Sequence, residues 1–271
     1  MSIPQTLAII AGNGIYPQAM AQAARLAGVP RLVVAAFQEE TNPTLVDWVD
    51  ELLWLRVGQL GKMLHFLKST GATHAVMSGQ IHPQNLFNLR PDLKALFLLA
   101  KLKRRNAESI FGAIADEMSK IGVELLPATT FMEEHLAPTG RFAGPKLKKR
   151  EEEDLHYGFQ VAKESARLDI GQTVVIKNGT ILAVEAFEGT NAAMKRGGEL
   201  GRQDALMVKV SKPNQDFRFD VPVIGPLTIE AAKDSRIRAI GVEAGKTLLL
   251  EKTQLTALAD QYRISIFGLN L

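Results

Sequence analysis

The sequence predicts an α/β protein with two parts, a Rossmann-like parallel-sheet N-terminal domain and a mixed α/β C-terminal domain. In the first half, short apolar runs alternate with amphipathic helical patterns, as is typical of buried parallel strands covered by helices on both faces. A stretch rich in Pro and Gly follows, and beyond it the dipeptide Asn178-Gly179 indicates a tight hairpin turn. We therefore predict domains at 1–134 and 151–271, joined by a linker over 135–150.

The strands expected in the N-terminal domain are continuous apolar runs, with helical patterns between most of them. These runs are Leu7–Ala11, Leu32–Ala36, Leu52–Val57, His74–Ser78 and Val123–Leu126. Consecutive parallel strands need crossover connections, and helices supply them with right-handed geometry.

The C-terminal domain is expected to open with a helix over Glu151–Arg167 and then to form the hairpin at Asn178-Gly179. After the hairpin we expect a helix near Thr190 and a strand from Ala205. The remaining elements are a helix over Pro226–Lys233, a strand over Ile237–Val242, a helix over Thr253–Gln261 and a strand over Ile264–Phe267.

The composition of the 271 residues excludes several classes of protein. There is no cysteine, so the chain has no disulfide framework and no thiolate metal site. The net charge of +3 and an aromatic content of 6% offer few phosphate contacts and few stacking platforms, so we expect no nucleic-acid partner. The start lacks a signal-peptide pattern and no window approaches a membrane span, so we expect a cytoplasmic protein.

Gly12, Asn13 and Gly14 directly follow the first predicted strand and precede a helical stretch. Phosphate and nucleotide groups bind at such helix N-termini. The third glycine of the dinucleotide fingerprint is replaced by Pro17, which argues against a nicotinamide-dependent oxidoreductase. A nucleotide-sugar contact and a merely tight turn both stay open at this position.

The stretch Gly241–Thr247 resembles a P-loop, but only three residues separate its glycines where four are needed. The residues that follow it favour a strand over a helix. Glu243 and Lys246 lie at a predicted strand end, where they either reach a ligand or form a surface turn.

Three carboxylates, Glu185, Glu188 and Asp220, follow predicted strands and are our candidate catalytic residues and magnesium ligands. Magnesium prefers one or two carboxylates together with water and substrate phosphate oxygens, so a sparse acidic set suits it. A bound metal would promote attack of water on a diphosphate. The alternative is that the two glutamates are solvated and that Asp220 caps a helix.

Several polar residues near these carboxylates are candidates for holding a diphosphate. Basic side chains would neutralise it, and residues at the start of the predicted helix would add hydroxyl or amide contacts. The candidates are Lys195, Lys209, Thr190 and Asn191, with Arg196, Arg202 and Lys212 nearby.

The stretch Leu93–Arg105 combines an apolar stripe with a basic end. Such a helix either packs in a core, lies on an anionic membrane surface or lines a chamber for acyl chains.

At these residues the sequence resembles the LpxI type of magnesium-dependent UDP-2,3-diacylglucosamine pyrophosphatases. The similarity covers nearly the whole chain. It rests on six ordered motifs: AGNGIYP from Ala11, SGQIHP from Ser78, LRPD from Leu89, LDIGQTVVIKNGTILAVEAFEGTN from Leu168, VKVSKPNQDFRFDVPVIGP from Val208 and GVEAGKTLLLEK from Gly241.

The resemblance implies an Mg²⁺-dependent enzyme of lipid A biosynthesis in Gram-negative bacteria, peripheral to the inner membrane. The implied reaction splits UDP-2,3-diacylglucosamine into UMP and 2,3-diacylglucosamine 1-phosphate, which is lipid X. Asp220 stands at the essential acid of the family's DVPxIGP motif. Asn191 stands where the family usually has an aspartate, and Gln80 and His82 replace basic residues.

Combining both lines, we expect Asp220, Glu185 and Glu188 to position Mg²⁺, while Gly12–Gly14 and Gly79 with Gln80 hold uridine or phosphate. A non-catalytic protein that binds nucleotide sugar or lipid is the alternative, and a nicotinamide-dependent oxidoreductase is a further one. The sequence leaves open whether a homodimer forms.

Overall fold

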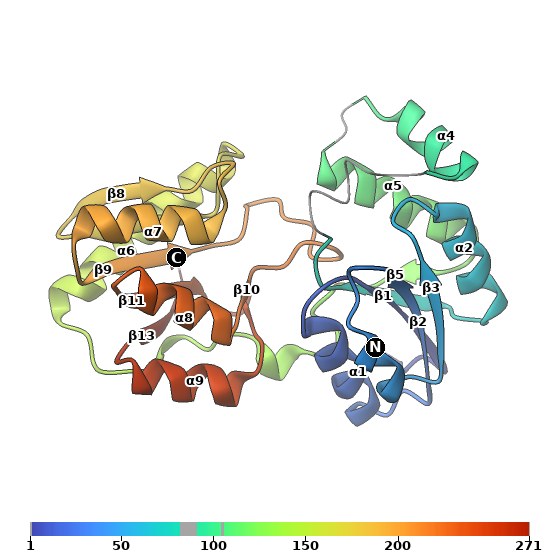
Figure 1. Cartoon of the computed structure of the whole chain (residues 1–271), viewed down its shortest axis with the longest axis horizontal. Helices are drawn as coiled ribbons and strands as arrows, with labels where there is room; N and C mark the ends of the chain where they lie inside the picture. The colour runs from blue at the N-terminus through green and yellow to red at the C-terminus, as the bar shows by residue number, and fades with distance from the viewer. Residues whose placement is uncertain (1, 82–90, 104–105, 271) are drawn as a thin grey trace. The chain divides into compact units, whose positions relative to one another are not determined.

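The structure is a computed structural model that describes residues 2–81, 91–103 and 106–270. The chain divides into two compact units (Figure 1). Unit 1 comprises Met1–Met132 and Asp216–Asp220, and unit 2 comprises Glu133–Gln215 and Val221–Leu271. Some residues of the predicted motifs lie outside the described ranges, namely His82, Pro83, Leu89, Arg90, Arg104 and Arg105.

Unit 1 is built on a parallel sheet of five strands in the order β3-β2-β1-β4-β5. The chain winds outward in both directions from β1, so the neighbouring ends of β1 and β4 form the topological switch point of the sheet. The strands are β1 (Thr6–Ala11), β2 (Arg31–Phe37), β3 (Glu51–Leu55), β4 (His74–Ser78) and β5 (Glu124–Leu125).

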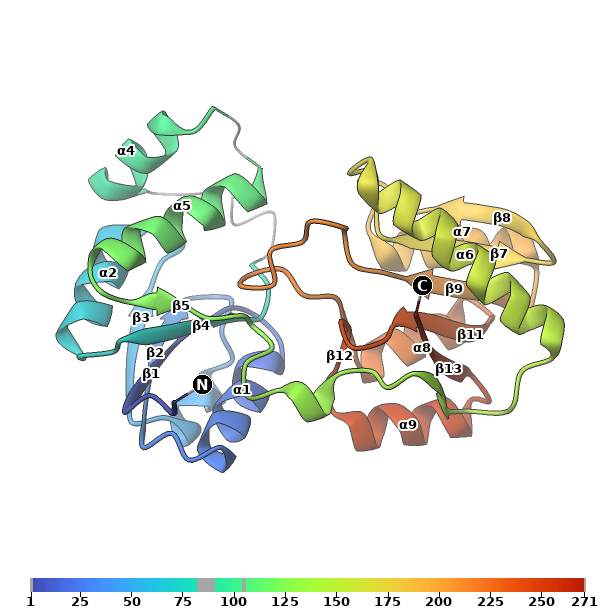
Figure 2. The same ribbon diagram turned by 180° about the vertical axis from the view of Figure 1, so that it is seen from behind.

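Helices cover the sheet of unit 1 on both sides, as Figures 1 and 2 show. Alternate strand residues such as Ala8 and Val33 pack in one apolar cluster with Leu67 of α2 and Met118 of α5. On the other side, α1 contacts β1 and β4. The helices are α1 (Tyr16–Leu26), α2 (Leu60–Ser69), α4 (Leu93–Lys101) and α5 (Ala107–Lys120), with a 3₁₀ helix, η1, over Pro43–Trp48.

Unit 2 is built on a mixed six-stranded sheet in the order β6-β13-β11-β9-β7-β8. Its three central strands are parallel, while the β7–β8 hairpin and β6 add antiparallel edges. A small parallel pair, β10 with β12, stands beside it. The strands are β6 (Gly140–Ala143), β7 (Thr173–Lys177), β8 (Thr180–Val184), β9 (Ala205–Lys209), β10 (Val223–Ile224), β11 (Ile237–Glu243), β12 (Leu248–Leu249) and β13 (Ser265–Leu269).

The two faces of this sheet belong to different apolar clusters. Phe159 of α6 packs on one face, and Met194 of α7, Ile229 of α8 and Leu255 of α9 pack on the other. The helices are α6 (Lys149–Arg167), α7 (Thr190–Gly201), α8 (Pro226–Asp234) and α9 (Lys252–Gln261), with a 3₁₀ turn, η2, over Glu133–His135.

The predicted fold class is confirmed: a parallel, Rossmann-like sheet is followed by a mixed α/β unit. Two features differ from the simple division of the chain. Gly140–Ala143, within the predicted linker, form the edge strand β6, because Gly140, Arg141 and Ala143 pair with Gly268, Phe267 and Ile266 of β13. In addition, Asp216–Asp220 group with unit 1, although the sequence predicts one continuous domain from residue 151.

The part of the chain that the structure describes contains no candidate membrane-spanning helix. No helix there is both long enough and apolar enough to cross a bilayer.

Candidate functional site

The loops after β1 and β4 meet at the switch point of unit 1. The Gly12 N–H donates to the Ser78 carbonyl oxygen at 2.8 Å, and the Asn13 N–H donates to the Gln80 carbonyl oxygen at 2.6 Å. The Gln80 N–H returns a bond to the Asn13 carbonyl oxygen at 3.3 Å. The structure therefore brings together the residues that the sequence assigns to nucleotide or phosphate contact in this half of the chain.

Glycine is required here because backbone lies directly against backbone. A Cβ atom on Gly12 would stand 2.5 Å from the Gln80 carbonyl oxygen, and one on Gly79 would stand 2.5 Å from the Asn13 carbonyl oxygen. Gly79 also has a φ of +85°, a left-handed conformation that costs other residues energy. The two glycines thus allow the two loops to approach each other closely at the switch point.

An open depression of about 580 Å³ adjoins this point at the carboxyl ends of β1, β2 and β3. Its lining includes Asn13 and Gly14 from the first loop, Glu39 and Thr41 after β2, and Trp54 on β3. The Thr41 hydroxyl donates to the Ala11 carbonyl oxygen at 2.5 Å and accepts from the Phe37 N–H at 2.8 Å, which fixes the second loop to the first. Ligands bind at this edge of open parallel sheets.

In unit 2, Glu185, Thr190 and Lys209 come together at the end of β8, the start of α7 and the end of β9. The Thr190 hydroxyl donates to Glu185 Oε1 at 2.9 Å, and Lys209 Nζ approaches the same hydroxyl at 3.4 Å. The Gln172 N–H donates to Glu185 Oε2 at 3.4 Å. The half-buried Glu185 is therefore held beside a cationic side chain, an arrangement suited to a diphosphate with a cation.

Glu188, in contrast, already has close partners. Its Oε1 forms an ion pair with Arg196 at 2.6 Å, and its Oε2 accepts from the Ala186 N–H at 3.0 Å. The hydrogen bond from Arg196 lowers the pKa of the Glu188 carboxyl. Asn191 and Lys195 are exposed on the first turns of α7. Glu188 would have to exchange Arg196 for a metal in order to act as a ligand.

Asp220 ends the segment Asp216–Asp220, which packs in unit 1. The Phe219 ring lies 5.5 Å from the Phe111 ring, centroid to centroid, and the Phe217 carbonyl oxygen accepts from the Ala128 N–H at 2.7 Å. Asp216 pairs with Arg218 at 2.6 Å, and its main-chain oxygen accepts from the Asp220 N–H at 3.0 Å. The exposed Asp220 side chain thus lies at the end of a turn that hydrogen bonds, an ion pair and a ring contact hold in place.

The fit of the three predicted carboxylates to Mg²⁺ differs between them. Asp220 belongs to unit 1, whereas Glu185 and Glu188 belong to unit 2. Within the described ranges no group of three His, Asp or Glu side chains is arranged to hold a metal. Mg²⁺ usually takes only one or two carboxylates and completes its shell with water and phosphate. Within unit 2, Glu185 accepts hydrogen bonds from Thr190 and Gln172, whereas Glu188 would first have to give up its ion pair with Arg196, so Glu185 suits the metal better than Glu188.

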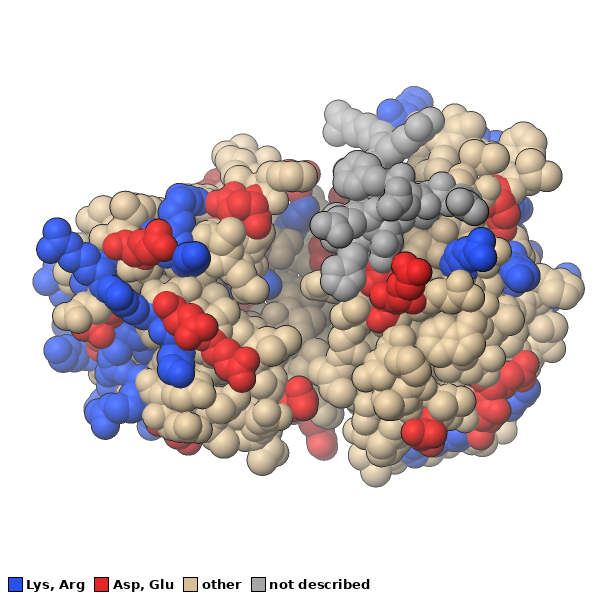
Figure 3. All heavy atoms as spheres, viewed as in Figure 1, with Lys and Arg blue, Asp and Glu red and all other residues tan. Residues whose placement is uncertain are grey.

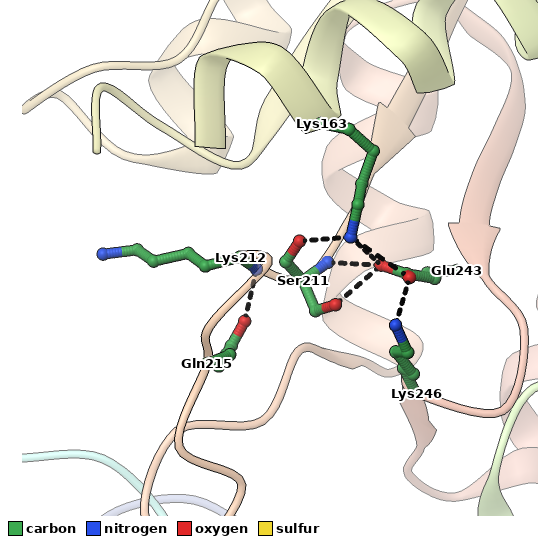
Figure 4. Close-up of polar contacts among 6 residues, drawn as sticks. All are labelled: Lys163, Ser211, Lys212, Gln215, Glu243 and Lys246. Carbon is green, nitrogen blue, oxygen red and sulfur yellow. Dashed lines mark hydrogen bonds and ion pairs between the residues drawn. The ribbon is translucent and has the colours of Figure 1, made fainter. Parts of the chain in front are cut away.

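Glu243 is the centre of a buried polar cluster in unit 2 (Figure 4). Its side chain is 6% exposed. Oε2 accepts from the Ser211 N–H at 2.8 Å and from the Ser211 hydroxyl at 2.7 Å, and Oε1 accepts from Lys246 Nζ at 2.8 Å. Lys163 Nζ reaches both oxygens at 3.1 and 3.2 Å. The sequence places Glu243 among substrate contacts, yet here both of its oxygens are bonded inside the protein.

Sequence reasoning missed Lys163 and Ser211 in this cluster. A signal for Lys163 exists, because it lies one residue after Ala162 and four after Phe159, at the margin of the apolar stripe of α6. A lysine at such a position needs an acidic partner. Ser211 carries no comparable signal.

Comparison with known proteins bears on the whole chain. The model of the LpxI N-terminal domain matches residues 6–135, and that of the LpxI C-terminal domain matches residues 138–267. The chain belongs to the LpxI family. A curated relative from Caulobacter vibrioides, the UDP-2,3-diacylglucosamine pyrophosphatase LpxI, is 30% identical over 275 residues, which is 97% of each protein.

Membership of the LpxI family confirms the resemblance read from the six motifs. It also confirms the prediction of an enzyme, since the relative is named as a pyrophosphatase.

Solved structures add nothing on function. The biotin carboxylase domain of Hydrogenobacter thermophilus 2-oxoglutarate carboxylase aligns with a TM-score of 0.29 and 12% identity over 74% of this chain and 42% of that one. The biotin carboxylase subunit of a pyruvate carboxylase aligns with a TM-score of 0.27 and 16% identity over 68% of this chain and 38% of that one. The LpxI chain thus spans less than half of either structure, and likeness at this level carries no argument.

The crowding at Gly79 generates a stability prediction. Gly79→Ala should lower the free energy of unfolding by about 2–5 kcal/mol, because a left-handed conformation costs ~1–2 kcal/mol and overpacking costs ~1–3 kcal/mol. Gly71→Ala is the matched control, since Gly71 also has a positive φ, of +72°, but nothing within 4 Å of its added Cβ. Gly71→Ala should lower the free energy of unfolding only by the cost of the left-handed conformation. Equal losses in urea unfolding would contradict the close approach.

The Glu243 cluster generates a prediction of pH dependence. Burial works to raise the pKa of Glu243, but hydrogen bonds from Lys246, Ser211 and Lys163 outweigh it and lower the pKa from the ordinary 4.5. Its stabilising contribution is therefore present above pH 4.5 and lost as the pH falls further.

Thermal unfolding of wild type and Glu243→Gln from about pH 7 to about pH 3 tests this linkage. The difference in stability between the two should shrink as the pH falls through this range. Glu199→Gln, at an exposed position of α7, should follow the wild type throughout. A constant difference between wild type and Glu243→Gln would contradict the linkage.

Proposed function

We propose that the chain hydrolyses the diphosphate of UDP-2,3-diacylglucosamine in the presence of Mg²⁺, releasing UMP and 2,3-diacylglucosamine 1-phosphate, lipid X, in lipid A biosynthesis. The observation that carries this proposal is the match, along nearly the whole chain, to a relative that is named for this substrate. Asp220 in the DVPVIGP stretch and the Glu185–Thr190–Lys209 group supply the acidic and basic groups that the reaction needs.

In this reaction the oxygen of a water molecule bonds to one phosphorus, and the bond between that same phosphorus and the bridging oxygen breaks. The bridging oxygen leaves with the other phosphate group. The water proton passes to a carboxylate, for which the exposed Asp220 is our candidate. Lys209 and Lys195 would balance the charge of the diphosphate, and Thr190 and Asn191 would offer hydroxyl and amide groups to its oxygens. Bound Mg²⁺ would supply charge neutralisation on the phosphate oxygens, with Glu185 and Asp220, and Glu188 after release from Arg196, as its protein ligands.

We place the uridine half of the substrate in the depression of unit 1. Trp54 is 37% exposed at its rim and offers an aromatic face to a base. Glu39 carries a carboxylate suited to a ribose hydroxyl, as acidic residues after the second strand are in nucleotide-binding sheets of this kind. Gly12–Gly14, Gly79 and Gln80 lie at the switch point beside this depression and are our candidates for contact with uridine or phosphate.

Helix α4 supports contact with the lipid part of the substrate or with a membrane surface. Leu93, Leu96 and Phe97 are exposed on it, while Ala95 is buried in the apolar cluster of unit 1. Figure 3 shows basic side chains beside uncharged surface over this helix. A peripheral position at the inner membrane, a cytoplasmic location and a homodimer all stay predictions.

Replacement of Asp220 tests the catalytic assignment. Asp220→Asn should lower kcat by about 10²- to 10⁴-fold, as expected for loss of a proton acceptor. Phosphorus NMR with UDP-2,3-diacylglucosamine and Mg²⁺ would follow the appearance of UMP and lipid X. EDTA should stop turnover of the wild type. Asp234→Asn, an equally exposed change at the end of α8, is the control and should keep normal turnover.

Near-normal turnover of Asp220→Asn would contradict the role of Asp220, and full turnover in EDTA would contradict dependence on a metal. If the wild type binds the substrate but releases no UMP, the result would favour the alternative of a non-catalytic nucleotide-sugar or lipid-binding protein.

Tryptophan fluorescence tests the uridine position, because the chain has only Trp48 and Trp54. UMP should quench the signal in wild type and in Trp48→Phe, whose altered residue lies outside the depression. Trp54→Phe should lose the quenching, and Trp54→Ala should bind UMP roughly tenfold more weakly, since stacking on a base contributes ~1–3 kcal/mol. Quenching through Trp48 alone would exclude this position. Saturable binding of NADH instead of UMP would favour a nicotinamide-dependent oxidoreductase.

A further inference from the structure

The chain passes between the two units at three points, after Met132, after Gln215 and after Asp220. On the side of unit 2, all three passages are bonded to the turn between β11 and β12. This turn, Glu243–Leu248, overlaps the stretch Gly241–Thr247, which resembles a P-loop but has one residue too few between its glycines. We call it the 243–248 turn.

The first passage is bonded through Ala137, shortly after the chain enters unit 2. The Ala137 N–H donates to the Thr247 carbonyl oxygen at 2.9 Å, and the Gly245 N–H donates to the Ala137 carbonyl oxygen at 2.9 Å. Leu136 and Leu248 form an antiparallel bridge beside them. The turn and the incoming chain therefore hold each other by main-chain bonds in both directions.

The second passage is bonded through Ser211, which follows β9 and leads to Gln215. Every polar group of Ser211 is bonded in the Glu243 cluster (Figure 4). Its N–H and hydroxyl donate to Glu243, and its carbonyl oxygen accepts from Lys163 Nζ at 2.9 Å. Ser211 is fully buried. The position of the chain as it leaves unit 2 is thus set by one carboxylate and one ammonium group.

The third passage is bonded at the far end of the turn. The Leu248 N–H donates to the Pro222 carbonyl oxygen at 2.9 Å, and Val223–Ile224 pair with Leu248–Leu249 as β10 and β12. The segment Ser211–Pro222 therefore leaves unit 2 from one end of the 243–248 turn and returns to its other end. Asp216–Asp220 lie at the middle of this segment.

Burial makes the cluster sensitive to the loss of its charge. Glu243 is 4% exposed, and the Lys163 side chain is 13% exposed. Removing the carboxylate would leave Lys163 as a largely buried ammonium without its acidic partner, and the unpaired N–H and hydroxyl of Ser211 would each carry a desolvation cost. The local structure is then expected to open, so that Ser211 and the lysine regain water.

We propose that Glu243 is a positioning residue that acts through Ser211 and the 243–248 turn to fix both ends of the Asp220-bearing segment. The inference rests on the proposed catalytic role of Asp220. It gives the P-loop-like motif a task that involves no phosphate, since both Glu243 oxygens are occupied by Ser211, Lys163 and Lys246.

Glu243→Gln in the full-length protein tests the proposal, with Asp154→Asn as the matched control. Asp154 is 7% exposed and accepts from the Asn178 and Gly179 N–H groups, both at 2.7 Å. It is therefore a buried carboxylate on α6 of unit 2 that holds the β7–β8 turn and no passage between the units. Both variants should lose thermal stability.

Hydrogen exchange and steady-state kinetics should separate the two variants. Glu243→Gln should exchange roughly tenfold faster over residues 211–222. It should also lose at least about tenfold in kcat with little change in KM, since a misplacement of ~1 Å at a reacting group costs up to ~10²-fold. Asp154→Asn should exchange faster only around residues 178–179 and keep the wild-type kcat.

Unchanged exchange over 211–222 in Glu243→Gln would overturn the proposal, and so would a wild-type kcat per folded molecule. If Glu243→Gln fails to fold, Ser211→Ala removes one of the bonds and should show smaller changes in the same direction, whereas no change would overturn the proposal. A wild type without hydrolase activity would refute the proposed function, while the exchange data would still decide whether Glu243 holds the segment.

Discussion

A carboxylate that leaves water must find a bonding partner for each oxygen, and Glu243 meets this requirement in a way that organises much of unit 2. Its oxygens are bonded to Ser211 at the end of β9, to Lys163 on helix α6 and to Lys246 in its own turn. Three elements that are distant in sequence are thus joined by a single charge. The net charge of the cluster is positive, because two ammonium groups face one carboxylate.

Unit 1 meets a related demand by main-chain geometry alone. At its switch point the two loops satisfy one another's N–H and carbonyl groups, and glycines allow the close approach. Polar groups are therefore satisfied by side-chain charge at one strand end of the protein and by main-chain hydrogen bonds between two loops at the other. The Glu243 cluster holds a polypeptide segment, whereas the switch point of unit 1 adjoins an open surface for a ligand.

The fold could be predicted from the sequence because its signals are local. Apolar runs mark β1, β2 and β4, and Asn178-Gly179 marks the β7–β8 turn, where Asn178 has a φ of +52°. The strand β6 could not be predicted, because its pairing with β13 joins residues more than a hundred positions apart. The docking of Phe219 against Phe111 was hidden for the same reason.

The candidate site was foreseen in its parts. The neighbourhood of Gly12 and Gly79 follows from parallel topology, and that of Glu185 and Thr190 follows from their short separation in sequence. The ion pair of Glu188 with Arg196 and the interior bonding of Glu243 were not foreseen, since spacing gives the element on which a charge stands but not the partner that it meets.

The insertion of Asp216–Asp220 into unit 1 bears on how the two family domains of this protein evolved. The two family domains meet near residues 135–138, as if they were separable modules. Yet Asp216–Asp220 of the second module group with the first unit, and Phe219 packs there against Phe111. A recombination event at that boundary would pair a segment from one ancestor with a surface from another, so the two halves are expected to have diverged together as one evolutionary unit.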